Sequence, residues 1–553
     1  MGFQEEVIYQ AYIKSFNDSK GNGYGDIKGV KNKLAYLSKL GITMIWLNPF
    51  YPSPQNDNGY DISNYTAIDP VYGGMADFEA LIKEAKTYGI KIMIDLVLNH
   101  SSTEHEWFQK ALAGDKKYQD YYILREAAEG QEFPTNWQSK FGGPAWEKFG
   151  NTDKYYLSLF DKTQADLNWR NEEVREELAK VVRFWMDKGV KGFRLDVINL
   201  IGKDQNLKNS TGDITQEKSL YTDRPIVHEY LKELSKNSFG KDPEIITVGE
   251  MSSTSIEECI QYTKPESNEL TMAFNFYHLK VDYLNGKKWT KVPFDFLELK
   301  KIINDWQIGL SENNGWNALF WNNHDQPRAV SRFGDDENYR EKSATSQAHI
   351  LHFLHGTPFV YQGEEIGMTN PYFEELNQYQ DVESQNAYEI MKEEGKTHKE
   401  IMEILKEKSR DNSRTPMQWS GERNAGFTEG GPWIEPAKNY PEINVKNEVE
   451  NGEIFSYYQK LIHLRKEKEL IQLGAYEPIL LEDEQIWAYR RIYKGEELIT
   501  ISNFYGEEAN VTLSNEGLDG AWKYLIGNYG KREFTENLKL APYESLSFIR
   551  KNK

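Results

Sequence analysis

The chain repeats one pattern along most of its length: an amphipathic stretch that ends at a glycine, followed by a short apolar run. The three clearest helical stretches, at about 27–40, 75–88 and 171–188, stop at Gly41, Gly89 and Gly189 and precede the apolar runs 43–47, 91–98 and 192–196. A glycine just past the last periodic residue marks the end of a helix. Strands that alternate with helices at this spacing indicate βα units in a parallel sheet.

Five further apolar runs continue the series, at 7–9, 245–248, 270–273, 318–321 and 357–361. Together with the first three they make about eight strands. A parallel sheet of this many βα units closes into a barrel. The fold class is therefore predicted as α/β, a (β/α)8 TIM barrel.

Three segments interrupt or follow this repeat. The stretch between Leu98 and Gly192 is too long for one loop and one helix, so an inserted subdomain after strand three is expected at 101–168. A second insertion is expected at about 369–436, with a solvated helix over 387–408. Beyond residue 471 short strands alternate, which predicts a C-terminal antiparallel β-sandwich over 471–553. The barrel itself is assigned to 1–100 and 169–470.

Composition narrows the class of protein. A net charge of −20 argues against a general nucleic-acid or membrane surface, because both require clustered positive charge. The one cysteine, Cys259, excludes an internal disulfide and a cysteine-based zinc site. The first residues lack the pattern of a signal peptide, and no apolar run is long enough to span a bilayer. We expect a cytoplasmic protein, with a monomer favoured and no nucleic-acid or membrane partner.

Polar residues follow the predicted strands at the point where each strand ends. In a barrel, functional side chains gather at these carboxyl ends. The side chains expected to meet there are Asp95 and His100, Arg194 and Asp196, Glu250, and His324 and Asp325. Several carboxylates in one place repel one another and need a chemical reason. Glycoside hydrolysis supplies one, since it uses a general acid and a second carboxylate.

The motifs around these residues resemble the α-amylase superfamily, glycoside hydrolase family 13. The matching segments are 95–100 (DLVLNH), 164–168 (QADLN), 192–196 (GFRLD), 248–250 (VGE) and 323–325 (NHD). The resemblance implies a catalytic barrel, an inserted domain and a C-terminal β domain. It also implies that Asp196 is the nucleophile, Glu250 the general acid/base and Asp325 the transition-state stabiliser of a retaining enzyme.

Two further segments, 58–61 (NGYD) and 410–419 (RDNSRTPMQW), are similar to the exo-acting oligo-1,6-glucosidase type of this family. In that resemblance Asp61 and Arg410 hold the terminal glucose together with three site residues, His100, Arg194 and His324, while Tyr60 provides a stacking surface. Val197, directly after the nucleophile, is typical there of enzymes for α-1,6 or trehalose-type substrates.

Further segments resemble the phosphotrehalases, which hydrolyse trehalose 6-phosphate to glucose and glucose 6-phosphate. These segments are 134–137, 140–143, 222–223, 248–254, 278–283 and 286–289. The resemblance makes Lys280 and Lys288 candidates for holding the phosphate of a small phosphorylated disaccharide. The alternative is an oligo-1,6-glucosidase (isomaltase) that acts on neutral α-1,6-glucosides. A non-enzymatic relative is the third alternative, against which the complete set of acids argues.

The loop 17–26 places oxygen-bearing side chains at Asp18, Asn22 and Asp26, a spacing similar to that of a calcium loop. Lys20 occupies one of the alternating ligand positions, where a cation opposes Ca²⁺. No cofactor is expected to be required, and a structural Ca²⁺ in this loop is the one metal candidate.

Overall fold

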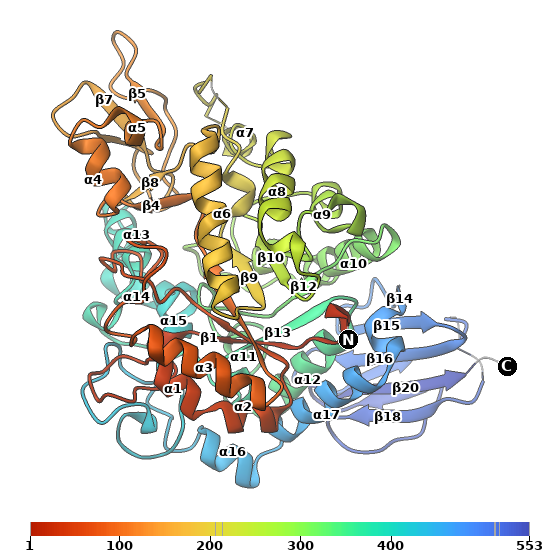
Figure 1. The fold of residues 1–553 in the computed structure, drawn as a ribbon. Helices are drawn as coiled ribbons and strands as arrows, with labels where there is room; N and C mark the ends of the chain where they lie inside the picture. The colour runs from red at the N-terminus through yellow and green to blue at the C-terminus, as the bar shows by residue number, and fades with distance from the viewer. Residues whose placement is uncertain (1, 205, 213, 514–515, 519, 552–553) are drawn as a thin grey trace.

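Eight parallel strands in chain order form the barrel (Figure 1). They are β1 (Ile8–Ala11), β2 (Met44–Leu47), β3 (Lys91–Leu96), β9 (Gly192–Leu195), β10 (Ile246–Glu250), β11 (Met272–Phe274), β12 (Ala318–Leu319) and β13 (Thr357–Tyr361). β13 pairs with β1, and a single parallel bridge between Ala273 and Asn317 joins β11 to β12 and closes the ring. This computed structural model describes residues 2–204, 206–212, 214–513, 516–518 and 520–551. The predicted (β/α)8 barrel is confirmed.

Helices form an outer layer between successive strands (Figure 1). They are α1 (Ile27–Asn32), α2 (Leu34–Leu40), α3 (Met75–Thr87), α6 (Glu172–Asp187), α8 (Ile226–Asn237), α9 (Ile256–Thr263), α10 (Phe296–Glu312) and α12 (Arg340–Phe353). The single helix expected over 27–40 is wrong. Lys33 leaves helical geometry, so α1 and α2 are separate.

The segment after β3 forms a small domain above the barrel (Figure 1). It contains β4 (His100–Ser102), α4 (Glu106–Leu112), α5 (Lys116–Gln119), β5 (Leu124–Glu126), β6 (Trp146–Lys148), β7 (Lys154–Leu157) and β8 (Gln164–Asp166). β4 and β8 pair in antiparallel fashion, with His100 opposite Asp166, so the segment leaves and rejoins the barrel at one place. The domain limits given above stay predictions.

The second insertion carries α13 (Val382–Glu393), α14 (His398–Lys408) and α15 (Asp411–Arg414). The expected solvated helix over 387–408 is wrong in two respects. Gly395, at φ 90°, separates two helices. Their facing sides are also buried in a shared cluster that includes Met391 and Leu405. In the sequence, the regularly spaced charged residues of the outer face make this apolar side hard to recognise.

After the last barrel strand, the chain forms α16 (Val445–Asn451), α17 (Ile454–Glu467) and α18 (Glu469–Leu473) and then enters the C-terminal β domain. α17 packs against α12 and α2 and so belongs to the outer helical layer. Its antiparallel sheet follows the order β14 (Ala475–Ile479), β15 (Ile486–Tyr493), β16 (Glu496–Asn503), β20 (Ser545–Lys551) and β18 (Lys523–Gly527), with β17 (Ala509–Thr512) and β19 (Asn537–Leu540) as a second pair. Apolar side chains of both sheets share one core. Within the described residues, no helix is both long and apolar enough to cross a membrane.

Candidate active site

One buried arginine connects three carboxylates at the end of the barrel strands. Arg194, on β9, is 1% exposed. Its Nη1 donates to Asp95 at 2.5 Å and to Asp196 at 2.6 Å, and its Nη2 lies 2.7 Å from Oε2 of Glu250. β3, β9 and β10 are neighbours in the sheet, which brings these side chains together. The predicted convergence at one end of the barrel is therefore observed for Asp196 and Glu250.

Burial and the neighbouring charges act in opposite directions on the carboxyl of Asp196. Burial raises the pKa of Asp196 well above its usual value, and the negative charges of Glu250 and Asp95 act in the same direction against Arg194. Arg194 opposes this shift, so its guanidinium favours the ionised form of Asp196 that a nucleophile needs.

The residue after Asp196 has a strained backbone. Val197 has φ 37° and ψ 41°, which is rare for a β-branched side chain and costs about 1–3 kcal/mol. In this conformation its N–H donates to Oε2 of Glu250 at 3.1 Å. The strained turn directly after Asp196 thus directs the Val197 N–H to the Glu250 carboxylate and holds that carboxylate in place.

Asp325 lies among cations. Oδ1 of Asp325 accepts from Nη2 of Arg414 at 2.7 Å and lies 3.4 Å from Nη1 of Arg410. Burial would raise its pKa, but the positive charges of Arg410 and Arg414 oppose this and hold the pKa well below its usual range. Burial lowers the pKa of His324 itself to about 3, so its ring is neutral at about pH 7. The arginines therefore keep Asp325 ionised.

Three aromatic rings, those of Tyr60, His324 and His100, belong to the predicted site. The ring of Tyr60 stacks on His324 with centroids 5.4 Å apart, and its hydroxyl lies 2.7 Å from Nε2 of His324. His100 is 1% exposed, and burial lowers its pKa to about 4, which leaves it neutral. Its Nε2 lies 3.2 Å from the Gln164 amide. Neutral rings that can donate or accept suit the hydroxyls of a sugar.

The acid opposite Arg410 is Asp57, and the prediction of Asp61 in that place is wrong. The Asp61 carboxylate accepts from Ser53 Oγ at 2.7 Å and from the Asn56 N–H at 2.9 Å, so it fixes its own loop. Oδ1 of Asp57 lies 3.4 Å from Nη2 of Arg410. Both acids belong to one turn, and their spacing alone does not show which one faces the site.

Asp381 is a site residue that the sequence motifs missed. It is fully buried and accepts from Nη2 and Nε of Arg410 at 2.7 and 3.0 Å, and from Nη1 of Arg414 at 3.1 Å. It immediately precedes α13, where no recognisable motif marks it. This one carboxylate orients both guanidinium groups toward Asp325.

The two predicted phosphate lysines differ in their surroundings. Lys288 pairs with Glu383 at 2.6 Å, and Glu383 also lies 3.3 Å from Nε of Arg410. Glu383 therefore offsets the charge of Lys288, and the role of Lys288 in holding the phosphate stays a prediction. The Nζ of Lys280 lies 4.8 Å from the ring centroid of Tyr277. Among the described residues, no carboxylate lies within ion-pair distance of Lys280.

Lys280 belongs to a cluster of three lysines, with Lys140 and Lys218 of α7 (Ile214–Ser219). Burial, and then the charges of Lys218 and Lys280, lower the pKa of Lys140 to about 7. Burial and Lys218 lower the pKa of Lys280 to about 8. The carboxylate of Glu217 acts in the opposite direction on Lys140 and Lys218, so it offsets part of the repulsion between the lysines. Lys140 stands in a segment that the resemblance already marked, whereas no motif pointed to Lys218.

An open cleft of about 520 Å³ lies beside Lys140 and Lys288. Its lining includes Lys140, Phe141, Trp289 and Glu383. The guanidinium of Arg410 lies 5.1 Å from the ring centroid of Phe141. Of the three lysines, Lys140 therefore lies in the wall of this cleft, directly before the Phe141 ring that contacts Arg410.

The loop 17–26 is held by hydrogen bonds of its own side chains. Lys20 Nζ donates to the carbonyls of Pro70 and Val71 at 2.9 and 3.0 Å. Both Asp18 oxygens already accept backbone N–H groups, and the Asp26 carboxylate accepts from Ser19 and from the N–H of Gly29. Within the described ranges, no cluster of three or more acidic, histidine or cysteine side chains is arranged to hold a metal.

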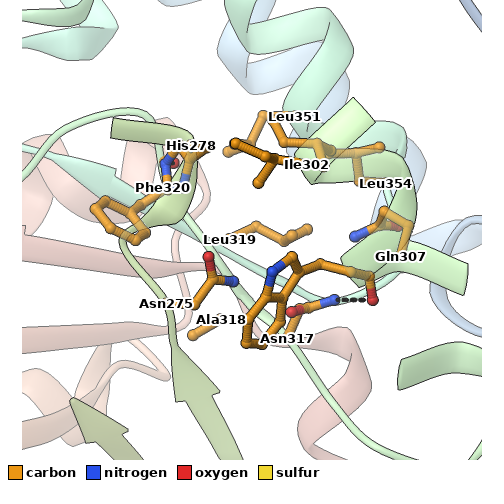
Figure 2. A pocket seen from close by; sticks show the side chains of 12 residues that line it. Asn275, His278, Ile302, Gln307, Asn317, Ala318, Leu319, Phe320, Leu351 and Leu354 are labelled. Atoms are coloured by element: carbon orange, nitrogen blue, oxygen red, sulfur yellow. Dashed lines mark hydrogen bonds between the residues drawn. The ribbon is translucent and has the colours of Figure 1, made fainter. Parts of the chain in front are cut away.

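A second, smaller hollow of about 30 Å³ lies outside the barrel wall (Figure 2). Its lining is mostly apolar and comes from β12, α10 and α12, with Ile302, Leu319 and Leu354 among the side chains shown. It has room for about one water molecule, which is too little for a sugar.

Comparison with protein families matches residues 10–474 to "Alpha amylase, catalytic domain" and residues 486–546 to "Alpha-amylase SusG C-terminal domain". The chain is similar to trehalose-6-phosphate hydrolase of Bacillus subtilis (strain 168), with 51% identity over 99% of this chain and 98% of the relative. It is also similar to oligo-1,6-glucosidase of Bacillus cereus, with 46% identity over 99% of both chains.

Among solved structures, the crystal structure of trehalose-6-phosphate hydrolase from Bacillus licheniformis superimposes with a TM-score of 0.94. The two sequences are 52% identical, and the match covers 99% of each chain. The shared fold therefore includes the barrel, the inserted segments and the C-terminal β domain.

Proposed function

Because the chain belongs to the alpha-amylase family of glycoside hydrolases, we propose that it hydrolyses trehalose 6-phosphate to glucose and glucose 6-phosphate. The observation that carries this proposal is the cluster of Lys140, Lys218 and Lys280, of which Lys140 lines the open cleft. Three lysines against the one carboxylate of Glu217 leave an excess of positive charge, which suits a phosphate dianion better than a neutral disaccharide.

The chemical step follows the retaining pathway. Asp196 attacks the anomeric carbon while Glu250 protonates the leaving oxygen, and a covalent glucosyl-enzyme forms. Water then enters, Glu250 removes its proton, and attack at the anomeric carbon breaks the bond to Asp196. Arg194 supports both steps, because it contacts both carboxylates and holds their geometry.

The remaining site residues bind the terminal glucose and stabilise the charge that develops on it. Asp325, kept ionised by two arginines, faces the positive charge of the oxocarbenium-like transition state. Asp57 and Arg410 present an acceptor and a donor that suit neighbouring hydroxyls of a non-reducing end. Tyr60 and the neutral His324 provide a flat surface with polar edges.

A substrate panel tests the proposal. We expect kcat/KM for trehalose 6-phosphate to exceed the values for trehalose, isomaltose and maltose by at least about 100-fold, because two charge-assisted hydrogen bonds contribute roughly 1.5–3 kcal/mol each. Faster cleavage of isomaltose would contradict it and favour the oligo-1,6-glucosidase alternative.

The pH dependence of KM should differ between phosphorylated and neutral substrates. Only protonated lysines bind the phosphate, and protonation is lost as pH rises through the pKa values of Lys140, about 7, and Lys280, about 8. The phosphate stays largely dianionic above its second pKa of about 6. We therefore expect KM for trehalose 6-phosphate to rise between about pH 7 and 9. A parallel rise in KM for p-nitrophenyl α-glucoside would contradict this explanation.

We propose that no metal ion is needed, because the Lys20 ammonium holds the loop 17–26 against the turn at Pro70. Chelator-treated enzyme should keep its activity, and added calcium should shift Tm by less than about 2 °C. The Lys20→Asp variant provides the contrast: it should have a lower Tm that calcium partly restores. A large calcium-dependent Tm shift of the unmodified enzyme would contradict the proposal.

We also propose that the protein acts in the cytoplasm and as a monomer on a small sugar phosphate. The single, buried Cys259 is compatible with a reducing compartment. Cell fractionation and light scattering of the purified protein test these two points separately.

A further inference from the structure

We propose that Asp282 is a positioning residue that holds the Lys280 loop in place and thereby sets the preference for a phosphorylated over a neutral glucoside. The inference rests on the proposed function, and it concerns a side chain that lies behind the phosphate lysines. Asp282 is 4% exposed and follows Lys280 by two residues.

Asp282 joins two cations that come from distant parts of the chain. Its Oδ1 lies 2.6 Å from Nη2 of Arg332, and its Oδ2 lies 2.9 Å from Nε of the same side chain. The ammonium of Lys408 lies 2.5 Å from Oδ2. All three side chains are at most 6% exposed. A buried carboxylate with two cationic partners is held firmly in one position.

Each cation also connects this carboxylate to a segment of the active site. Arg332, on α11 (Ala329–Phe333), donates to the carbonyl of Leu279 at 2.5 Å and to Gln326, next to Asp325, at 2.9 Å. Lys408 ends α14, two residues before Arg410, and also donates to the backbone carbonyl of Asp282 at 3.1 Å. Asp282 therefore ties the Lys280 loop to the two segments that carry Asp325 and Arg410.

The start of the loop has its own attachment. The loop begins with the short helix η6 (Tyr277–Leu279), and Nε2 of His278 lies 3.0 Å from the carbonyl of Phe320. Figure 2 shows His278 and Phe320 together beside the small hollow, at the barrel wall. The Lys280 N–H donates to the carbonyl of Tyr277 at 3.0 Å. Lys280 thus stands between a fixed point at the barrel and a fixed point at Asp282.

These two attachments determine where the Lys280 ammonium group can lie. Lys280 has a long, flexible stem, and its Nζ contacts an aromatic ring rather than a carboxylate. The position of the Lys280 backbone therefore determines where its Nζ can reach. If the Asp282 end of the loop is released, Lys280 loses its fixed origin, whereas Asp196 and Glu250 remain held by Arg194.

The test is the Asp282→Asn variant, assayed with trehalose 6-phosphate and with p-nitrophenyl α-glucoside. We expect KM for trehalose 6-phosphate to rise at least 10-fold with little change in kcat, so that the ratio of kcat/KM for the two substrates falls about 10-fold. Asp282→Glu, which keeps the charge, should recover part of the ratio. Asp305→Asn on α10, where Asp305 forms an exposed pair with Lys301, is the matched control and should leave the ratio unchanged.

Circular dichroism and Tm establish that each variant is folded, and Asp282→Glu provides the readout if Asp282→Asn does not fold. An equal loss on both substrates would overturn the inference, because Asp282 would then support the whole site. An unchanged ratio in a folded Asp282→Asn variant would overturn it as well. If the unmodified enzyme itself shows no preference for trehalose 6-phosphate, the proposed function fails first, and the inference fails with it.

Discussion

Asp196→Asn is expected to lose roughly 10⁴-fold or more in kcat, the largest effect of any single change in the site. The amide cannot form the glycosyl ester, and it keeps the size of the carboxylate. By the usual conversion, this loss corresponds to about 5.5 kcal/mol of transition-state stabilisation. The measurement is the steady-state rate with p-nitrophenyl α-glucoside, whose good leaving group makes the first step less dependent on acid catalysis.

The fold of this variant should survive. Asp196 is one of three carboxylates around Arg194, and burial already opposes its charge. Removing that charge relieves repulsion, so Tm should stay the same or rise. Asp242→Asn is a matched control, since Asp242 pairs with Lys191 in a partly exposed position. A variant that keeps more than about a hundredth of the activity would contradict the role of nucleophile.

Lys280→Ala is expected to raise KM for trehalose 6-phosphate by about 10- to 100-fold, because a charge-assisted hydrogen bond contributes roughly 1.5–3 kcal/mol. Removing Lys140 in addition should raise it further. The effect should appear as a lower ratio of kcat/KM between trehalose 6-phosphate and p-nitrophenyl α-glucoside. Initial rates over a range of both substrates provide this ratio.

Lys287→Ala is the control for this experiment. Lys287 lies on the same segment as Lys280 but is exposed to solvent. Screening by water and salt leaves such a charge little influence on binding. If Lys287→Ala and Lys280→Ala raise KM equally, the general positive charge of the entrance, rather than a built phosphate site, is responsible.

The sequence predicts the architecture well because the barrel repeats one local rule. Each helix ends at a glycine or another cap and each strand is a short buried run, so strands such as β13 are located from neighbouring residues alone. The positions of the predicted catalytic acids could be inferred in the same way, because the carboxyl ends of the strands meet on one face of the barrel. The helix over 387–408 shows its limit: the charged outer face is evident in the sequence, while the buried face depends on contacts with distant residues.

The partners of each charge could not be predicted. Asp57 and Asp61 lie in one turn, and only the path of the chain decides which faces Arg410. Lys288 looks like Lys280 in sequence, yet Glu383, from a distant insertion, neutralises it. Asp381 and Lys218 have no motif of their own. Side-chain pairing across long loops depends on tertiary structure, which local spacing does not encode.

A competition experiment tests the central claim, that the enzyme prefers trehalose 6-phosphate to a neutral glucoside. Equal concentrations of trehalose 6-phosphate and isomaltose, each well below KM, are incubated with the enzyme in one vessel, and both products are followed over time. The ratio of the initial rates then equals the ratio of the two kcat/KM values. We predict that the initial rate of trehalose 6-phosphate consumption exceeds that of isomaltose by at least about 100-fold. Equal or faster consumption of isomaltose would contradict the assignment of the lysine cluster as a phosphate site.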